Sequence, residues 1–387
     1  MQGVEVSHLN AAIRAILKAY YDFKHSLVED ALRPISAYGK SDTLGMDAGP
    51  EITICSELNR YDNGAVVITE EIGSKAVEKL SDNFRPSDPQ TFRTVFISDP
   101  TDRSNQLKAF LRGFSGERRI GDILIDPETV TKWENGYSGP ASITGATSAI
   151  SCVRRGLPIF SVIVNYITQE LVISCAAGIK ILKLPEERMG GIDLNYILTN
   201  GEPLHFPGID GRMKDKRKFV TFLGDTGKIG YRENFVDSGF MNEKQIEKFL
   251  HYGKPGGPSR AFYLSSLQPY SIPIGFVLAN GEKIGEWIHW LSFVRFARSQ
   301  EDDSQPALIL YEISHDRPWT KEGVLMSTPP NYSVFRKYNE KLYIDTSWLL
   351  KMLNPSKLRS TLMVAPFDNR WAVSASSQSG YRPIVFL

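Results

Sequence analysis

Hydrophobic residues recur every three or four positions along the first thirty residues, which is the spacing of an amphipathic helix. The apolar positions are Leu9, Ile13, Ile16, Tyr20, Phe23 and Leu27. Ser7 has a side chain suited to an N-cap, and Pro34 would stop the helix. The pattern therefore predicts that the chain opens with a long helix that buries one face.

The spacing of apolar residues changes to a strand pattern further along the chain. AVVIT (65–69) and TVFIS (94–98) are short, β-branched runs. Between 142 and 175 three further runs follow: an alternating stretch from Ser142 to about Val153, then FSVIVNY, then LVISC. Turn-forming residues near 155–156 and 168–169 separate them. This order predicts an antiparallel meander.

In the second half, strand-like runs at 219–223, 307–313 and 323–328 accompany a helical stretch at 285–297. A polar, basic segment favours a boundary near 190–215. We therefore expect an α+β fold with helices and sheets in layers. We expect an N-terminal α+β subdomain over 1–195 that carries most of the site, and a C-terminal α/β subdomain over 196–387. About 333–387 would be a C-terminal extension.

Composition narrows the classes of partner. The chain has 387 residues and a net charge of about +1, so no overall charge favours binding to nucleic acid or to an anionic membrane. The three cysteines fit no zinc or redox spacing. The sequence shows no charged leader before an apolar stretch and no run of membrane-spanning length. The expectation is a cytoplasmic protein that binds neither nucleic acid nor membrane.

Carboxylates follow two of the predicted strands. Glu70 and Glu71 come directly after AVVIT, and Asp99 and Asp102 come at the end of TVFIS. Several carboxylates that converge at a sheet edge repel one another unless a cation holds them. Mg²⁺ prefers oxygen ligands of this kind and commonly shares them with substrate phosphate. The pattern favours a magnesium site at this edge.

A helix is expected to begin directly after these aspartates. Arg103 and Ser104 would lie in its first turn, where unsatisfied backbone N–H groups attract an anion. A cation held by the aspartates and the backbone N–H groups at the helix start would together form a phosphate site. A plainer interpretation also stands, because Asp-Pro-x-Asp is a good turn sequence and Asp102 could simply cap the helix.

These residues resemble the inositol monophosphatase-like superfamily, which includes fructose-1,6-bisphosphatase. Members carry a glutamate pair after one strand and Asp-Pro-(Ile/Leu)-Asp-Gly-(Thr/Ser) after the next. The matching segments are VITEE (67–71) and ISDPTDRS (97–104). Asp47 and Glu51 in GMDAGPE match an upstream family element, and Asp42 resembles an aspartate before it. The resemblance covers about 7–185 well and 215–335 loosely.

The resemblance implies a layered α-β-α-β-α sandwich and a phosphatase with two or three Mg²⁺ ions. Its metal ligands would be the carboxylates of Glu70, Asp99 and Asp102 together with the Thr101 carbonyl. Asp47, Ser104 and Glu70 would form the catalytic set, with Ser104 and Asp47 positioning the attacking water. The amides of Arg103 and Ser104 would bind phosphate.

Two departures from the family pattern stand out. Arg103 replaces a glycine, so its side chain would either hinder the approach of phosphate or grip it. The family's later Trp-Asp ligand is missing. Glu286 is the expected replacement, whereas an alignment on Trp290 would place Leu291 at the ligand position. Arg260, in a glycine-rich loop, would meet a second phosphate or a sugar hydroxyl.

The leading hypothesis is a Mg²⁺-dependent phosphomonoesterase acting on a small sugar, inositol or nucleotide phosphate. One alternative is a catalytically degenerate relative that binds a phosphorylated ligand or a partner protein. Another is a specialised phosphatase in a biosynthetic pathway. A homodimer is also left open, because members of the family are often dimers.

Overall fold

The structure is a computed structural model of the chain. It describes residues 3–35, 42–61, 66–69, 94–137, 141–155, 157–187, 190–203, 219–224, 248–251, 276–283, 292, 308–315, 335–338, 341–344, 359–366 and 382–385.

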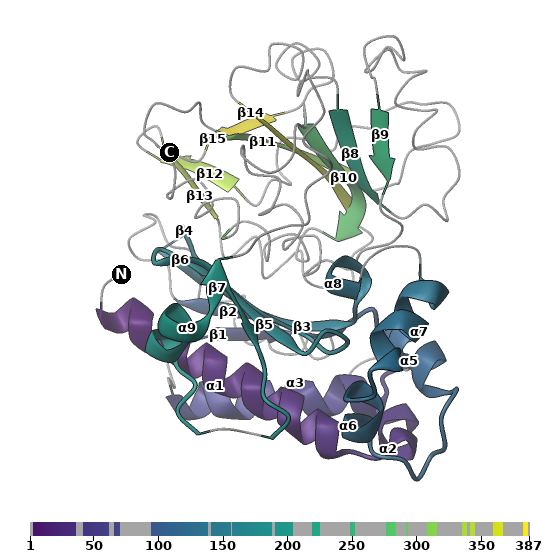
Figure 1. Cartoon of the computed structure of the whole chain (residues 1–387). Coiled ribbons are helices and arrows are strands. Elements are labelled where there is room, and N and C mark those ends of the chain that lie inside the picture. The colour runs from purple at the N-terminus through teal and green to yellow at the C-terminus, as the bar shows by residue number, and fades with distance from the viewer. Residues whose placement is uncertain are drawn as a thin grey trace.

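The first part of the chain combines helices with a seven-stranded sheet (Figure 1). Its helices are α1 (Gly3–His25), α2 (Val28–Leu32), α3 (Gly45–Tyr61), α5 (Ser104–Leu111), α6 (Ile120–Leu124), α7 (Glu128–Gly136), α8 (Ala141–Thr144) and α9 (Leu194–Asn200). Its strands are β1 (Val66–Thr69), β2 (Val95–Asp102), β3 (Thr147–Arg154), β4 (Leu157–Asn165), β5 (Glu170–Cys175), β6 (Gly178–Lys183) and β7 (Glu202–Pro203).

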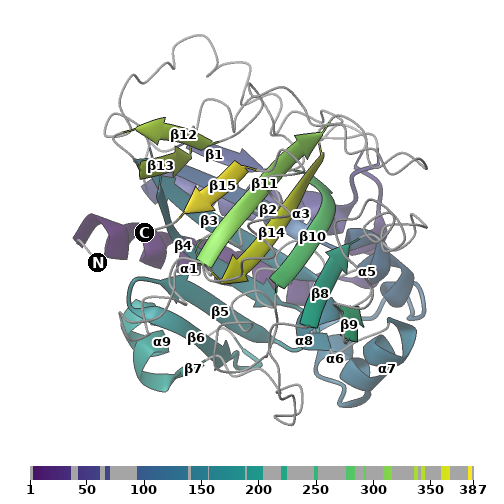
Figure 2. The same ribbon diagram turned by 90° about the horizontal axis from the view of Figure 1, so that it is seen from above.

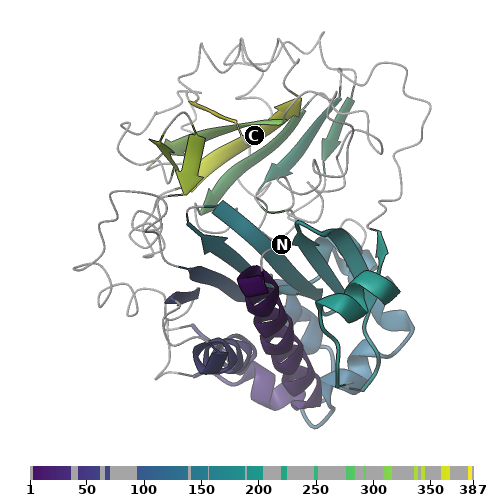
Figure 3. The ribbon, with the colours of Figure 1, turned by 90° about the vertical axis from the view of Figure 1, so that its left-hand side faces the viewer.

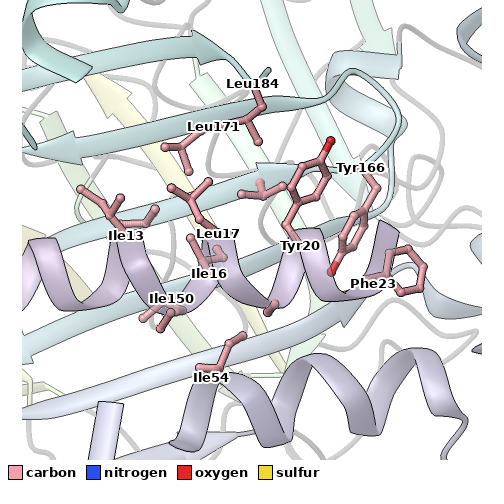
Figure 4. Packing of buried hydrophobic residues seen from close by; sticks show 14 of the residues in the cluster. Ile13, Ile16, Leu17, Tyr20, Phe23, Ile54, Ile150, Tyr166, Leu171 and Leu184 are labelled. Carbon is pink, nitrogen blue, oxygen red and sulfur yellow. The ribbon is translucent and has the colours of Figure 1, made fainter. Parts of the chain in front are cut away.

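The strands of this sheet lie in chain order, β1 to β7. β1 and β2 run parallel, and every later neighbour is antiparallel, so the predicted meander is confirmed. Helices α1 and α3 cover one face, which we call the α1 face (Figure 1). Ile13, Ile16 and Leu17 of α1 pack there against Ile150 and Leu171 of the sheet (Figure 4).

Two details at the ends of the predicted elements were wrong. Ser7 does not cap the first helix: it lies one turn inside α1, and its hydroxyl donates to the Gly3 carbonyl. The chain from Ser142 is not yet a strand, because α8 precedes β3. A serine hydroxyl inside a helix can donate a hydrogen bond to the backbone carbonyl four residues earlier, so a serine does not by itself mark where a helix starts.

Two glycines of α3 predict different effects of the same substitution. A Cβ on Gly45 would clash with the backbone carbonyl oxygen of Asp30, whereas a Cβ on Gly49 would meet nothing within 4 Å. We expect Gly45→Ala to lower the unfolding free energy by about 1–3 kcal/mol. Gly49→Ala is the matched control and should change it by less than about 1 kcal/mol, because the gain in helix propensity is opposed by crowding of the new Cβ against the ring of Pro50. Urea unfolding of the two variants checks this, and equal effects would contradict the packing at Gly45.

A six-stranded sheet is built from later segments (Figure 2). Its strands, in spatial order, are β15 (Arg382–Val385), β11 (Leu308–His315), β14 (Arg359–Pro366), β10 (Phe276–Lys283), β8 (Phe219–Gly224) and β9 (Lys248–His251). β12 (Phe335–Tyr338) and β13 (Lys341–Ile344) form a separate hairpin. The C-terminal extension therefore supplies β14, which lies between β11 and β10 inside this sheet.

Small hydroxyl side chains line part of the sheet face opposite α1. Ser151, Ser161 and Ser174 pair across β3, β4 and β5, and the Ser151 and Ser161 hydroxyls are 2.6 Å apart. The hydroxyl of Ser292, a buried helical residue, donates to Ser161 Oγ at 2.6 Å. A helical residue from the second half of the chain therefore packs on this face, on the side where the six-stranded sheet lies (Figure 3).

The predicted α+β class is confirmed, with helices and two sheets in layers (Figures 1 and 3). The strands expected at 219–223 and 307–313 are present as β8 and β11. The strand expected at 323–328 lies outside the described residues, as does all of the helix expected at 285–297 except Ser292. The three cysteines are free thiols. Within the described part of the chain, no helix is both long and apolar enough to cross a membrane.

Candidate functional site

The parallel pair β1–β2 brings the two predicted carboxylate segments to one edge of the sheet. Thr69, the last residue of β1, pairs with Ser98 of β2. Glu70 directly follows Thr69 in the sequence, and Asp99 directly follows Ser98. Glu70 itself lies outside the described residues, so its part in the site stays a prediction.

A bulge in β2 places Asp99 and Asp102 on the same face of the sheet. Residues three apart in a regular strand point to opposite faces. Asp99 pairs with Ala149, but Asp102 pairs with Thr147, so β2 contains one extra residue between these pairs. Asp99 and Asp102 therefore share one side. That side is the one opposite α1. Phe96 points into the α1-face core, and Asp99 lies three residues further along the regular part of β2, so its side chain points to the other face.

The start of α3 is joined to this bulge by Thr101. The buried Thr101 hydroxyl donates to the carbonyl of Met46 at 2.7 Å. Asp47, the next residue, is buried, and its Oδ2 accepts a hydrogen bond from the Leu44 amide at 3.1 Å. This reach back to the residue before the helix is the acidic half of a capping box. It fixes the Asp47 carboxylate beside the β2 segment.

Arg103 occupies the joint between β2 and α5 in a left-handed conformation, with φ 63° and ψ 32°. A side chain in this region costs about 1–2 kcal/mol, which glycine avoids. The Arg103 amide donates to Asp102 Oδ1 at 2.8 Å. The N-cap of α5 is therefore Arg103 and not Asp102, which the plainer interpretation had made the cap. Arg103 was expected inside the first turn, but α5 begins at Ser104.

The Arg103 side chain is buried rather than extended into solvent. Its guanidinium carbon lies over the Tyr137 ring, 5.7 Å from the ring centre. Burial lowers the pKa of the Arg103 guanidinium. The neighbouring Asp102 and Tyr137 act in the opposite direction and raise this pKa. The side chain therefore places positive charge beside Asp102 and packs on the end of α7.

The donor atoms around the bulge are all oxygen. Thr69 Oγ1 and Thr147 Oγ1 are buried hydroxyl oxygens that make no hydrogen bond among the described residues. Thr147 pairs with Asp102, and Thr69 directly precedes Glu70. The described residues contain no group of three metal-ligating side chains. Asp99, Asp102 and Thr147 nevertheless share one face and offer oxygen atoms only, which suits Mg²⁺ better than a transition metal.

Sequence reasoning missed a buried hydroxyl network on the α1 face beneath the bulge. The Ser148 hydroxyl donates to the Pro100 carbonyl, and Tyr166 OH lies 2.5 Å from Ser148 Oγ and 3.4 Å from the Pro100 carbonyl. One signal in the sequence could have found it. Tyr166 continues the alternation that puts Val162 and Val164 in the core, and a buried tyrosine hydroxyl needs a partner.

The structure therefore brings five predicted site residues to one place: Asp47, Asp99, Thr101, Asp102 and Arg103. Ser104 follows them as the half-buried first residue of α5. Its expected pairing with Asp47 stays a prediction, as does phosphate binding by the Arg103 and Ser104 amides. Glu70, Glu286 and Arg260 lie outside the described residues.

Comparison with known proteins gives structural similarity only. No family model and no curated protein matches the sequence. CysQ from Bacteroides thetaiotaomicron, described as a bacterial member of the inositol monophosphatase family, is 13% identical, with a TM-score of 0.49 over 94% of this chain and 98% of its own. An inositol monophosphatase from Zymomonas mobilis is 14% identical, with a TM-score of 0.44 over 95% and 97% of the two chains.

A third solved structure, inositol monophosphatase II from Staphylococcus aureus, is 11% identical, with a TM-score of 0.46 over 95% of this chain and 94% of its own. These neighbours are inositol monophosphatases or members of that family by name.

Proposed function

We propose that the protein is a Mg²⁺-dependent phosphomonoesterase that hydrolyses a small sugar, inositol or nucleotide phosphate. The bulge in β2 is the observation that carries this proposal. It turns Asp99 and Asp102 to one face, directly before the N-terminus of α5 and beside the start of α3. Carboxylates for a cation and helix amides for an anion then meet at one point, as phosphoryl transfer requires.

Each residue has a distinct part in this proposal. Asp99, Asp102 and the Thr101 carbonyl, with Glu70, would hold Mg²⁺. When bound, Mg²⁺ neutralises charge on the phosphoryl group and makes water more acidic. Hydrolysis forms a P–O bond to the water oxygen and breaks the P–O bond to the ester oxygen, which takes up a proton. Asp47, with Ser104, would orient the water and accept its proton.

Ser292 supports a contribution from the helical stretch that carries Glu286. Its hydroxyl bonds Ser161, which lies on the sheet face opposite α1. Asp99 lies on that same face. Glu286 is six residues before Ser292 in the sequence and lies outside the described residues. Glu286 is retained as the proposed substitute for the missing aspartate ligand, and Arg260 as a substrate contact.

Inorganic phosphate release from a panel of sugar, inositol and nucleotide monophosphates tests the proposal. We expect release that requires Mg²⁺ and stops in excess chelator. Glu286→Gln should reduce release if Glu286 is a ligand. Release that persists unchanged in chelator would overturn the metal-dependent mechanism.

A second candidate function is binding of a phosphorylated ligand without turnover, and Arg103 favours it. The glycine that it replaces would let a phosphate approach the backbone closely. Here the Arg103 amide already donates to Asp102, and the side chain is buried on Tyr137. Calorimetry that detects a phosphorylated ligand, with no phosphate release from any member of the panel, would favour this function. Release restored by Arg103→Gly would show that the arginine is the obstacle.

A further inference from the structure

Tyr166 lies directly beneath the carboxylate edge, on the opposite side of the sheet from Asp99. It follows β4 and belongs to the α1-face core, where its ring stacks on Tyr20 at 5.9 Å and contacts Phe23 at 4.8 Å (Figure 4). These contacts fix the ring. Its hydroxyl is therefore held at one position, at the backbone of the Asp99–Asp102 segment.

The hydroxyl of Tyr166 acts there as a hydrogen-bond donor, because Ser148 already donates its own proton to the Pro100 carbonyl. Burial raises the pKa of Tyr166 well above its ordinary value; hydrogen bonds with Ser148 and Thr101 oppose this, and the charges of Asp99 and Asp47 add to it. A tyrosine phenol is already protonated near neutral pH without any such shift. Its proton is available to Ser148, whose own proton goes to the Pro100 carbonyl.

This order of donors connects a rigid part of the core to the bulge. Tyr166 is fixed by aromatic packing, Ser148 belongs to β3, and Pro100 is the first residue between Asp99 and Asp102. Thr101, the next residue, donates to Met46 at the start of α3. Both residues of the bulge are therefore hydrogen-bonded on the α1 face, and the aspartates on either side of them stay on the other face.

We infer that Tyr166 and Ser148 are positioning residues for the carboxylate edge: their hydroxyls hold the Pro100–Thr101 bulge in the shape that turns Asp99 and Asp102 to one side. The expected effect on phosphate release rests on the proposed function, whereas the expected effect on the shape of the bulge does not. Residues that orient metal ligands typically contribute 10–100-fold to metal affinity or activity, which sets the size of the expected effect.

The test compares Tyr166→Phe and Ser148→Ala with Tyr20→Phe. Tyr20 is the matched control, because it is also fully buried and stacks on Tyr166, yet its hydroxyl makes no hydrogen bond among the described residues. We expect Tyr166→Phe and Ser148→Ala to raise the Mg²⁺ concentration for half-maximal phosphate release about tenfold. Substrate KM at saturating Mg²⁺ should change little, and the double variant should resemble the single ones because both act through Pro100.

Hydrogen–deuterium exchange supplies a readout that needs no activity. Tyr166→Phe and Ser148→Ala should speed exchange at the amides of 99–106, including the Arg103 amide, while Tyr20→Phe leaves it unchanged. If the wild type releases no phosphate, the proposed function fails while this exchange comparison still decides the inference. Unchanged exchange in both variants, or equal effects from Tyr20→Phe, would overturn it.

Discussion

Asp99→Asn should abolish Mg²⁺-dependent phosphate release while leaving the fold intact. Asp99 is buried at the bulge, and the substitution keeps its shape while removing the charge that a hard cation needs. Residues that only orient ligands already contribute up to about 100-fold, so loss of a ligand should cost at least that much in kcat. Phosphate release at saturating Mg²⁺ measures the loss.

A thermal shift separates loss of the metal from loss of the fold. Mg²⁺ that binds only the folded state stabilises it, so Tm of the wild type should rise with Mg²⁺ concentration. Tm of Asp99→Asn should equal that of the wild type in chelator and stay flat on adding Mg²⁺. Asp122→Asn, an exposed aspartate of α6, is the control and should behave as the wild type. A normal rise in Tm for Asp99→Asn would exclude Asp99 as a ligand.

Ile16→Ala should cause the largest loss of stability among the substitutions considered. Ile16 is fully buried in the middle of α1, within the core between that helix and the seven-stranded sheet (Figure 4). Removing three buried carbons from a packed core costs about 2–5 kcal/mol of unfolding free energy, because the lost transfer energy is joined by the energy of the cavity. The midpoint of urea unfolding, followed by circular dichroism, measures it.

Arg14→Ala is the matched control for that substitution. Arg14 lies two residues earlier in α1, is exposed, and has similar helix propensity to alanine. Its effect should stay within about 0.5 kcal/mol. Comparable losses in the two variants would mean that the helix stabilises the fold by its own propensity rather than by packing on the sheet.

Local patterns predicted most elements of the first sheet, because alternation and helical spacing are properties of neighbouring residues. β1, β2, β4 and β5 lie at the residues where apolar runs occur. The place of β14 could not be predicted in this way. Its position between β11 and β10 depends on pairing with strands about 50 and 80 residues away, and no local pattern encodes such partners.

The site was predictable in its residues but not in its geometry. Asp99 and Asp102 were found from their chemistry and their place after a strand, and Asp47 from the family resemblance. The bulge that turns Asp99 and Asp102 to one face is a matter of register. Pro100 is the only local hint, since a proline cannot donate to a strand ladder and favours bulges. Tyr166 was missed because its partners are backbone and hydroxyl groups far from it in sequence.

The proposed phosphatase requires that the β2 edge hold a divalent cation. A crystal grown with Mn²⁺ in place of Mg²⁺, with anomalous scattering recorded at the manganese edge, tests it most directly. We expect an anomalous peak at about 2.0–2.2 Å from carboxylate oxygens of both Asp99 and Asp102. A well-ordered site in which a basic side chain bridges the two carboxylates, with no anomalous peak, would contradict it.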